Sequence, residues 1–267
     1  MAAGSYQYIY GPVQSWRLGV SLGVDPLSRP EKLCNFNCRY CQLGPTVHFH
    51  CQRDIYVPTD DIISEIRGLP EGLKLDTITL SGRGEPTLAR NLGEIIRAVQ
   101  TVRPEPVAVI TNAVLMDRPD VRDDLGPADL VLVKMDAFDQ ASLQRMNAPP
   151  PDVRFDSIVL GIKEFRKQYP RRFALQIMFT GDNKSHAAQI AGIVRGIGAD
   201  EIELNTPLRP NPSAPLSRET LDDIKVIFSG CAPEVKTVYE LQSGAVRPLN
   251  KDDTVKRHGS YSLDEGS

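Results

Sequence analysis

The chain has 267 residues, of which 41% are apolar, and its 31 basic and 34 acidic side chains give a net charge of −3. This apolar content is enough to fill a core, so a globally disordered chain is excluded. The near-neutral balance argues against a protein that binds nucleic acid mainly through charge. The N-terminus lacks a basic start followed by an apolar stretch, and the apolar runs are only strand-length, so we expect a cytoplasmic protein without a membrane span.

Strand-like and helix-like patterns alternate along almost the whole chain. Such alternation is typical of a parallel sheet covered by helices, and both a doubly wound sheet and a partial barrel fit it. The predicted strands are 18–24, 75–80, 107–111, 130–133, 173–179, 201–204 and, more weakly, 235–239. The predicted helices are one that starts at Thr59, then 92–99, 155–168, 185–196 and 216–228.

The end of the chain differs from the rest in composition. Residues 249–267 contain few apolar side chains, so we expect a loosely packed tail there. Length allows one large domain or two small ones, since α/β barrels often run to roughly 200–250 residues. We therefore expect residues 1–248 to form a single domain.

Three of the five cysteines lie within eight residues. Cys34, Cys38 and Cys41 have the spacing C-x3-C-x2-C in a loop that follows the first predicted strand. Three thiolates on one short loop can hold three irons of a [4Fe–4S] cluster, which takes cysteine ligands. The fourth iron would then lack a protein ligand and could bind a small molecule through an amine and a carboxylate.

A structural zinc site is the alternative for the same loop. Zinc takes four closed ligands, and His48, His50 or Cys51 could supply the fourth, although a gap of three residues between the first two cysteines is unusual for zinc. The remaining two cysteines, Cys51 and Cys231, are too few to build a second cluster by themselves. A buried, inert thiol is the simplest interpretation of each.

A glycine-rich turn follows the second predicted strand. Ser81-Gly82-Arg83-Gly84-Glu85-Pro86-Thr87 allows a ligand to approach the backbone closely, and Glu85 together with the carbonyls of 82–84 suits an ammonium. A phosphate loop is a poor alternative, because Thr87 stands where a third glycine would be needed and no Gly-Lys-Ser/Thr follows.

Together, the cysteine loop and the glycine-rich turn resemble the radical SAM superfamily. The resemblance runs from about residue 8 to 230 and is closer to a subgroup of small members whose N-terminal segment looks like Tyr10-Gly11-Pro12-Val13-Gln14-Ser15-Trp16-Arg17-Leu18-Gly19-Val20-Ser21-Leu22-Gly23. An Arg often stands in that subgroup where this chain has Trp16. The resemblance therefore does not assign a substrate to this chain.

The resemblance implies a partial (β/α)6 barrel with parallel strands and outer helices. It also implies a [4Fe–4S] cluster on the three cysteines and S-adenosylmethionine on the open iron. A one-electron reductant such as flavodoxin or ferredoxin would drive formation of a 5′-deoxyadenosyl radical. That radical would abstract hydrogen from a small molecule or a peptide, with tRNA or a protein as the alternative substrate.

In barrels, functional residues gather at the carboxyl ends of the strands. Asn112 and Asp136 could hydrogen-bond ribose hydroxyls, and Lys134 could meet a carboxylate, although Asn and Asp after strands also form turns and caps. The resemblance also implies that Asn205 and Thr206 contact the adenine and that Tyr40 packs near it. The candidate cofactor-binding residues are Tyr40, Gly82, Gly84, Glu85, Thr111, Asn112, Lys134, Asp136, Met178, Asn205 and Thr206.

Two arginines are candidates for substrate binding. Arg17 belongs to the N-terminal segment, and Arg209 lies between two prolines after the strand predicted over 201–204. A guanidinium suits a carboxylate or phosphate, although a surface arginine is the commoner case.

Overall fold

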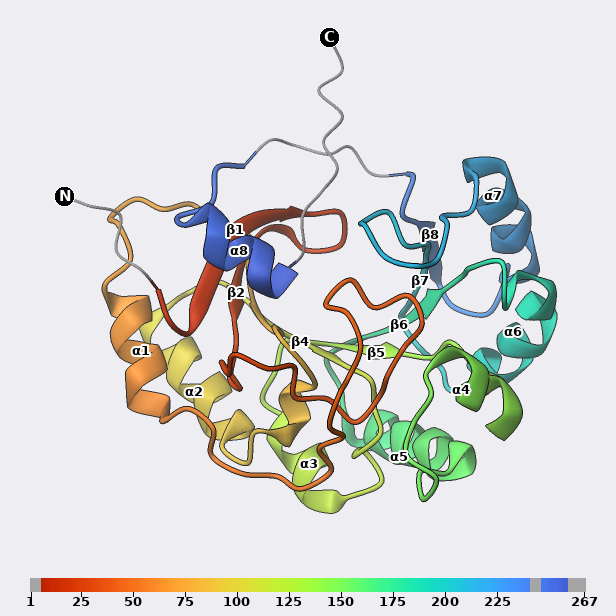
Figure 1. Ribbon diagram of the computed structural model, residues 1–267, viewed down its shortest axis with the longest axis horizontal. Coiled ribbons are helices and arrows are strands. Elements are labelled where there is room, and N and C mark those ends of the chain that lie inside the picture. The colour runs from red at the N-terminus through yellow and green to blue at the C-terminus, as the bar shows by residue number, and fades with distance from the viewer. Residues whose placement is uncertain (1–5, 241–245, 259–267) are drawn as a thin grey trace, which may run out of the picture.

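The computed structural model describes residues 6–240 and 246–258, and one sheet organises this part of the chain (Figure 1). Its eight strands follow the chain order from β1 to β8; β1 and β2 are antiparallel, and every later neighbour pair is parallel. The strands are β1 (Ile9–Ser15), β2 (Gly19–Val24), β3 (Thr77–Leu80), β4 (Val107–Thr111), β5 (Leu130–Lys134), β6 (Arg172–Met178), β7 (Glu201–Asn205) and β8 (Glu234–Thr237).

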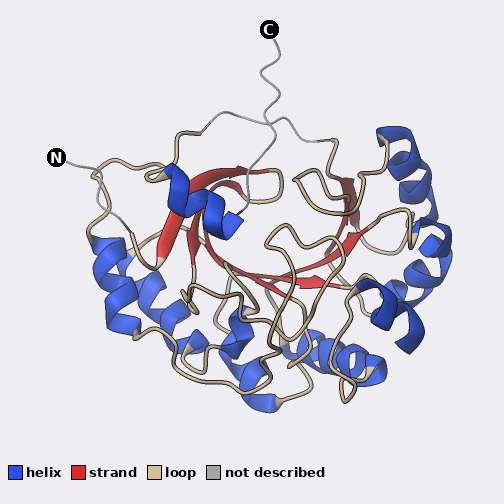
Figure 2. Cartoon of the chain, viewed as in Figure 1, coloured by secondary structure: helices blue, strands red, loops and turns tan. Residues whose placement is uncertain are grey.

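The first seven helices cover the outer, convex side of the curled sheet, whereas the last one lies against β1 at the open end of the barrel (Figure 2). The helices are α1 (Thr59–Arg67), α2 (Leu92–Val102), α3 (Pro119–Leu125), α4 (Gln140–Met146), α5 (Phe155–Gln168), α6 (Ala187–Arg195), α7 (Arg218–Ile227) and α8 (Lys251–His258), with short 3₁₀ turns at Pro86–Leu88 and Lys184–His186. In the described residues β1 and β8 do not pair, so the barrel stays open on one side. The expectation of a partial α/β barrel is confirmed. None of these helices is long and apolar enough to cross a bilayer.

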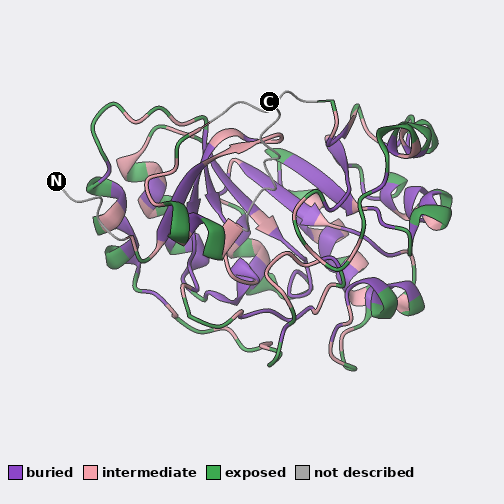
Figure 3. Ribbon diagram, turned by 45° about the horizontal axis from the view of Figure 1, so that its top comes forward, coloured by how far each residue is buried: buried purple, intermediate pink, exposed green. Residues whose placement is uncertain are grey.

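Apolar periodicity explains how the helices attach to the sheet. In α1, Ile62, Ile63 and Ile66 are buried, while Asp60 and Asp61 occupy the exposed first turn, where carboxylates favour the helix dipole. The main core lies between such helix faces and the sheet, as the buried strands and the exposed outer helix surfaces in Figure 3 show.

A second, smaller apolar group fills the barrel interior at the amino ends of the strands. It consists of five buried side chains and the partly buried Ile110. Towards the carboxyl ends the interior becomes polar, because Ser21 and Thr79 are hydrogen-bonded at 2.7 Å and Gln176 donates to Glu203 at 3.4 Å. The five buried members are Leu18, Ala108, Leu130, Leu132 and Ala174.

Some elements differ from the sequence prediction. The sequence does not predict strand β1, because its Gly11-Pro12 pair is typical of a turn. In the structure the register of β1 shifts between Tyr10 and Val13. The sequence does not predict the short helices α3 and α4 either, since seven residues are too few to show a clear helical period.

The expected loose tail over 249–267 differs from the structure for residues 249–258; residues 259–267 lie outside the described part. Helix α8 packs on β1, where Thr254 Oγ1 accepts a hydrogen bond from Gly11 N at 3.0 Å. Arg257 Nε lies 3.4 Å from Asp25 Oδ2, and these side chains are 11% and 1% exposed. Composition does not predict this contact. Helix α8 is mostly polar, and a buried ion pair rather than the burial of apolar side chains attaches it to the rest of the protein.

Replacing Arg257 by Met is expected to lower the free energy of unfolding by about 3 kcal/mol, because it leaves Asp25 buried without its cation. Lys256→Met on the same helix is the matched control, with an expected change within about 0.5 kcal/mol, since its pair with Asp253 is exposed on the lysine side. Urea denaturation measures both, and equal losses would contradict the assigned role of the buried pair.

Candidate active site

A cavity of about 250 Å³ opens at the carboxyl ends of the strands. It extends from the cysteine loop across the barrel interior to α8. The candidate residues that line it are Arg17, Tyr40, Cys41, Gly82, Gly84, Lys134, Met178, Asn205 and Arg209. A smaller adjoining hollow of about 80 Å³ is lined by Tyr40, Asn205 and Thr206 together with Trp16. Side chains from distant segments are therefore brought to one end of the barrel.

The cysteine loop is fastened to the glycine-rich turn by main-chain hydrogen bonds. Leu33 N donates to Arg83 O at 3.0 Å, and Glu85 N donates to Leu33 O at 2.9 Å. A Cβ atom at Gly84 would lie 1.7 Å from Leu33 O, so only glycine permits this pairing. The first requirement for Gly84 is therefore the approach of the cysteine loop, although Gly84 also lines the cavity.

Gly82 has a related role. Its φ is +143°, a conformation that side chains rarely adopt, and a Cβ atom there would lie 2.3 Å from Asp25 Cγ. Asp25 in turn accepts hydrogen bonds from Leu27 N and Ser28 N at the start of the segment leading to the cysteines. Both glycines therefore let neighbouring protein segments come close.

The Glu85 carboxylate is 2% exposed and is used inside the protein. Its Oε1 accepts from Thr111 Oγ1 at 2.6 Å, and its Oε2 accepts from Asn112 N at 2.7 Å. Thr87 donates to Oε1 as well, through both N and Oγ1. Glu85 therefore joins the ends of β3 and β4, and its expected contact with an ammonium stays a prediction.

Asn112 also turns towards the protein. Its Nδ2 donates to Asn35 Oδ1 at 2.6 Å and lies 3.8 Å from Cys34 Sγ, while its Oδ1 accepts from Val114 N at 3.0 Å. This side chain therefore supports the cysteine loop, and its expected contact with a ribose stays a prediction.

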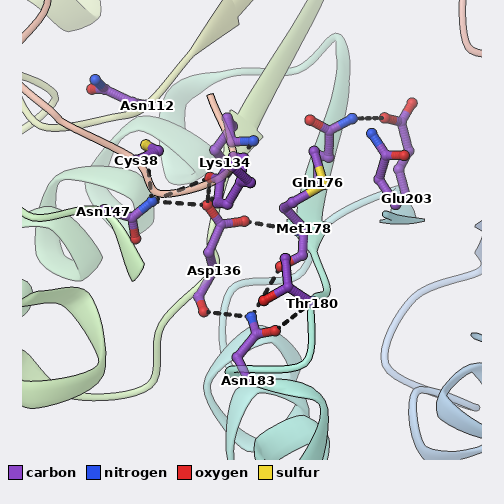
Figure 4. Close-up of polar contacts among 12 residues, drawn as sticks. Cys38, Asn112, Lys134, Asp136, Asn147, Gln176, Met178, Thr180, Asn183 and Glu203 are labelled. Atoms are coloured by element: carbon purple, nitrogen blue, oxygen red, sulfur yellow. Dashed lines mark hydrogen bonds and ion pairs between the residues drawn. The ribbon is translucent and has the colours of Figure 1, made fainter. Parts of the chain in front are cut away.

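Asp136, which follows β5, is the centre of a buried network (Figure 4). Its Oδ1 accepts from Met178 N at 2.7 Å, and its Oδ2 accepts from Asn147 Nδ2 at 2.9 Å and from Tyr40 Oη. Lys134 Nζ lies 4.6 Å from the centre of the Tyr40 ring and 4.0 Å from Asp136 Oδ2. The Asp136 carboxylate is thus used within the protein, whereas Lys134 faces the cavity.

Helix α8 brings residues to the cavity that sequence reasoning missed. Arg209 Nη1 donates to Gln42 Oε1 at 2.8 Å, and Arg209 Nη2 lies 2.8 Å from His258 Nε2. Gln42 Nε2 donates to His258 O at 2.6 Å, which ties α8 to the segment just after Cys41. Burial and the charges of Arg209 and Arg17 lower the pKa of His258 to about 3, so its imidazole is neutral and Nε2 accepts from Arg209.

Arg17 lies against a buried carboxylate. Its Nε is 3.7 Å from Glu203 Oε2 on β7, and the Glu203 side chain is 2% exposed. Burial raises the pKa of Glu203 to about 8, although Arg17 acts in the opposite direction. No local sequence signal links the two residues, because they become neighbours only when the sheet curls.

The remaining cysteines and histidines differ in their surroundings. Cys231 is buried near Ala191 O, and Cys51 is partly exposed. His48 is exposed, and the His50 main chain donates to Cys34 O at 3.0 Å. Within residues 6–240 and 246–258, no three His, Cys, Asp or Glu side chains converge on a single ion position.

A model of a known family matches residues 32–194, and its description is Radical SAM superfamily. The chain belongs to the radical SAM superfamily. Members of this superfamily are enzymes, so the protein is a radical SAM enzyme whose substrate is unknown.

Comparison with individual proteins agrees with this assignment. UPF0026 protein slr1464 of Synechocystis sp. is 38% identical over 209 residues, which are 78% of each chain. A radical SAM methyltransferase from Sphaerobacter thermophilus has a similar fold, with a TM-score of 0.62 and 15% identity over 81% of this chain and 66% of that one. Native anSMEcpe with bound AdoMet and Cp18Cys peptide gives a TM-score of 0.57 and 15% identity over 80% and 62% of the two chains. This chain thus spans less than two thirds of either solved structure.

The three cysteines of this radical SAM protein have the surroundings that cluster ligands need. Each sulfur has a side-chain nitrogen donor from a separate segment: Lys32 Nζ lies 3.2 Å from Cys41 Sγ, Asn147 Nδ2 lies 3.3 Å from Cys38 Sγ, and Asn112 Nδ2 lies 3.8 Å from Cys34 Sγ. Hydrogen bonds to sulfur stabilise thiolate ligands of iron–sulfur clusters. Burial raises the pKa of Cys34 to about 12 and also raises that of Cys38, so their thiolates need such donors and a metal. The residues therefore fit the group that the family implies.

Glu203→Gln is expected to change how stability depends on pH. Because the pKa of Glu203 in the folded protein lies near 8, against an ordinary value of 4.5, the folded state holds the proton more tightly. Glu203 therefore favours folding at low pH, and this contribution is lost as pH rises towards 8. Relative to Glu203→Gln, the wild type should lose stability between about pH 5 and pH 8, as measured by urea midpoints.

Glu164→Gln is the control, because its carboxylate is exposed and its pKa is lowered by the hydrogen bond from Lys167. It should follow the wild type over the same range. Parallel midpoints for the wild type and Glu203→Gln at every pH would contradict the assigned state of Glu203.

Proposed function

We propose that Cys34, Cys38 and Cys41 bind a [4Fe–4S] cluster whose open iron takes S-adenosylmethionine, and that the enzyme abstracts hydrogen from a small-molecule or peptide substrate. When bound and reduced by a one-electron donor such as flavodoxin or ferredoxin, the cluster supplies cleavage of S-adenosylmethionine to methionine and a 5′-deoxyadenosyl radical. The observation that carries the proposal is the set of three nitrogen donors, one at each cysteine sulfur, and Cys41 itself lines the cavity.

Different residues around the cavity bind different parts of S-adenosylmethionine in this proposal. The carbonyls of 82–84 accept from the ammonium, with Gly82 and Gly84 on the cavity wall. Lys134 pairs with the methionyl carboxylate, because its ammonium faces the cavity. Glu85 does not contact the cofactor in this proposal; its hydrogen bonds to Thr111 and Thr87 fix the glycine-rich turn.

The adjoining hollow suits the adenine. Tyr40, Asn205 and Thr206 line it, and Met178 lies at its boundary with the main cavity. An aromatic ring and amide groups match a flat heterocycle with polar edges. Asn112 and Asp136 take positioning roles, because their polar atoms are engaged with the cysteine loop and with Met178 N.

Arg17 and Arg209 line both the main cavity and the adjoining hollow, and we assign their guanidinium groups to the substrate. A guanidinium there suits a carboxylate or phosphate on the substrate. The peptide bound to anSMEcpe supports a peptide as one class of substrate, at the level of a shared fold. The near-neutral charge of this chain favours a small molecule or peptide over tRNA.

Cys38→Ala tests the proposal after anaerobic reconstitution with iron and sulfide. The wild type should bind about four irons, as one [4Fe–4S] cluster requires, and should release 5′-deoxyadenosine from S-adenosylmethionine on reduction. Cys38→Ala should lose both properties. Cys51→Ala is the control and should keep them, because Cys51 lies outside the C-x3-C-x2-C loop. One colourless zinc per wild-type chain, without 5′-deoxyadenosine, would overturn the proposal.

Arg209→Gln tests the substrate side separately. It should retain iron and should still release 5′-deoxyadenosine without substrate, because Arg209 lies outside the C-x3-C-x2-C loop and is hydrogen-bonded to Gln42 and His258. Transfer of deuterium from a labelled substrate into 5′-deoxyadenosine should fall at least tenfold, as expected when a charged hydrogen bond is lost. Arg90→Gln, at an exposed site, should leave transfer unchanged. Loss of iron in Arg209→Gln would contradict the assignment.

A further inference from the structure

Asn147, which no sequence motif marks, lies directly behind the cysteine loop. It is the C-cap residue of α4 and is 2% exposed. Its main-chain oxygen accepts from Asn37 N at 2.8 Å, and the preceding Met146 O accepts from Arg39 N at 3.1 Å. The last carbonyls of a helix have no partner within the helix. Here they hold the two residues that flank Cys38.

The side chain of Asn147 adds a contact to the sulfur itself. Its Nδ2 lies 3.3 Å from Cys38 Sγ and 2.9 Å from Asp136 Oδ2 (Figure 4). The same nitrogen lies 3.2 Å from Tyr40 Oη. A carboxylate and a sulfur both accept hydrogen bonds, so the amide must present its nitrogen to them rather than its oxygen. Asp136 is itself held by Met178 N at 2.7 Å, which fixes the direction of the amide.

We propose that Asn147 is a positioning residue that donates a hydrogen bond to the Cys38 thiolate and raises the midpoint potential of the bound cluster. The inference rests on the proposed function, since it needs the cluster on Cys38. A donor at the sulfur stabilises negative charge on the ligand. Reduction adds one electron to the cluster and its ligands, so the donor favours the reduced form.

Asn147 differs from the other two sulfur donors in its surroundings. Lys32 also donates to Gly44 O at 2.9 Å from a partly exposed position, where water competes for the ammonium. Asn112 is at 3.8 Å from its sulfur and donates to Asn35 at 2.6 Å. Asn147 combines burial with a short contact, and a hydrogen bond is electrostatically stronger where water is excluded.

The test compares Asn147→Leu with Asn183→Leu in reconstituted protein. Asn183 is a buried asparagine of the same network, which donates to Asp136 O at 3.3 Å and to Met178 O at 2.9 Å but contacts no sulfur. Asn147→Leu should lower the ratio of reduced to oxidised cluster about tenfold at a fixed potential, which is a shift of about 59 mV for one electron. Asn183→Leu should retain the wild-type potential. Redox titration followed by electron paramagnetic resonance measures both.

Asn147→Ser provides a second route if the leucine variant does not fold. Serine keeps a polar C-cap but is too short to reach the sulfur, so the potential should shift in the same direction. If the wild type binds the cluster but the Asn147 variants keep its midpoint potential, the inference is wrong while the proposed function stands. An equal shift of the potential in Asn183→Leu would have the same meaning. A wild type that binds no cluster would instead defeat the proposed function.

Discussion

The close contact between the cysteine loop and the glycine-rich turn after β3 is the constraint on which the rest of the site depends. Leu33 pairs with Gly84 through main-chain hydrogen bonds, and the space at Gly84 is too small for any side chain. This contact carries the loop over the carboxyl ends of the parallel strands. Cys34, Cys38 and Cys41 consequently face the same end of the barrel as Lys134 and Arg209.

The acidic residues at this end act mainly as buried structural groups. Glu85 joins β3 to β4, and Asp136 joins β5, β6 and the cysteine loop. Asp25 lies against Arg257 of α8, and Glu203 lies against Arg17. Removing a carboxylate from water is costly unless it is hydrogen-bonded or paired, so each of these groups specifies one arrangement of its neighbours.

Cations, by contrast, lie on the cavity side. Among the described residues that line the cavity are Arg17, Lys134, Arg209 and Arg257, with no Asp or Glu. The acidic side chains therefore lie behind the residues that line the cavity, whereas the basic side chains line it. Such a lining attracts ligands that carry carboxylate or phosphate groups. Helix α8 is part of this arrangement, since it supplies Arg257 and His258 from the far end of the chain.

The sequence by itself determined the α/β class, seven of the eight strands, the cysteine spacing and the superfamily, because periodicity and short motifs are local properties of the chain. It also identified the residues that reach the cavity at strand ends, such as Lys134 and Asn205. Only the tertiary structure decided what these residues contact. Glu85 and Asn112 point into the protein, Asn147 contacts Cys38 and α8 packs on β1, because burial and hydrogen-bond geometry depend on segments up to 250 residues apart.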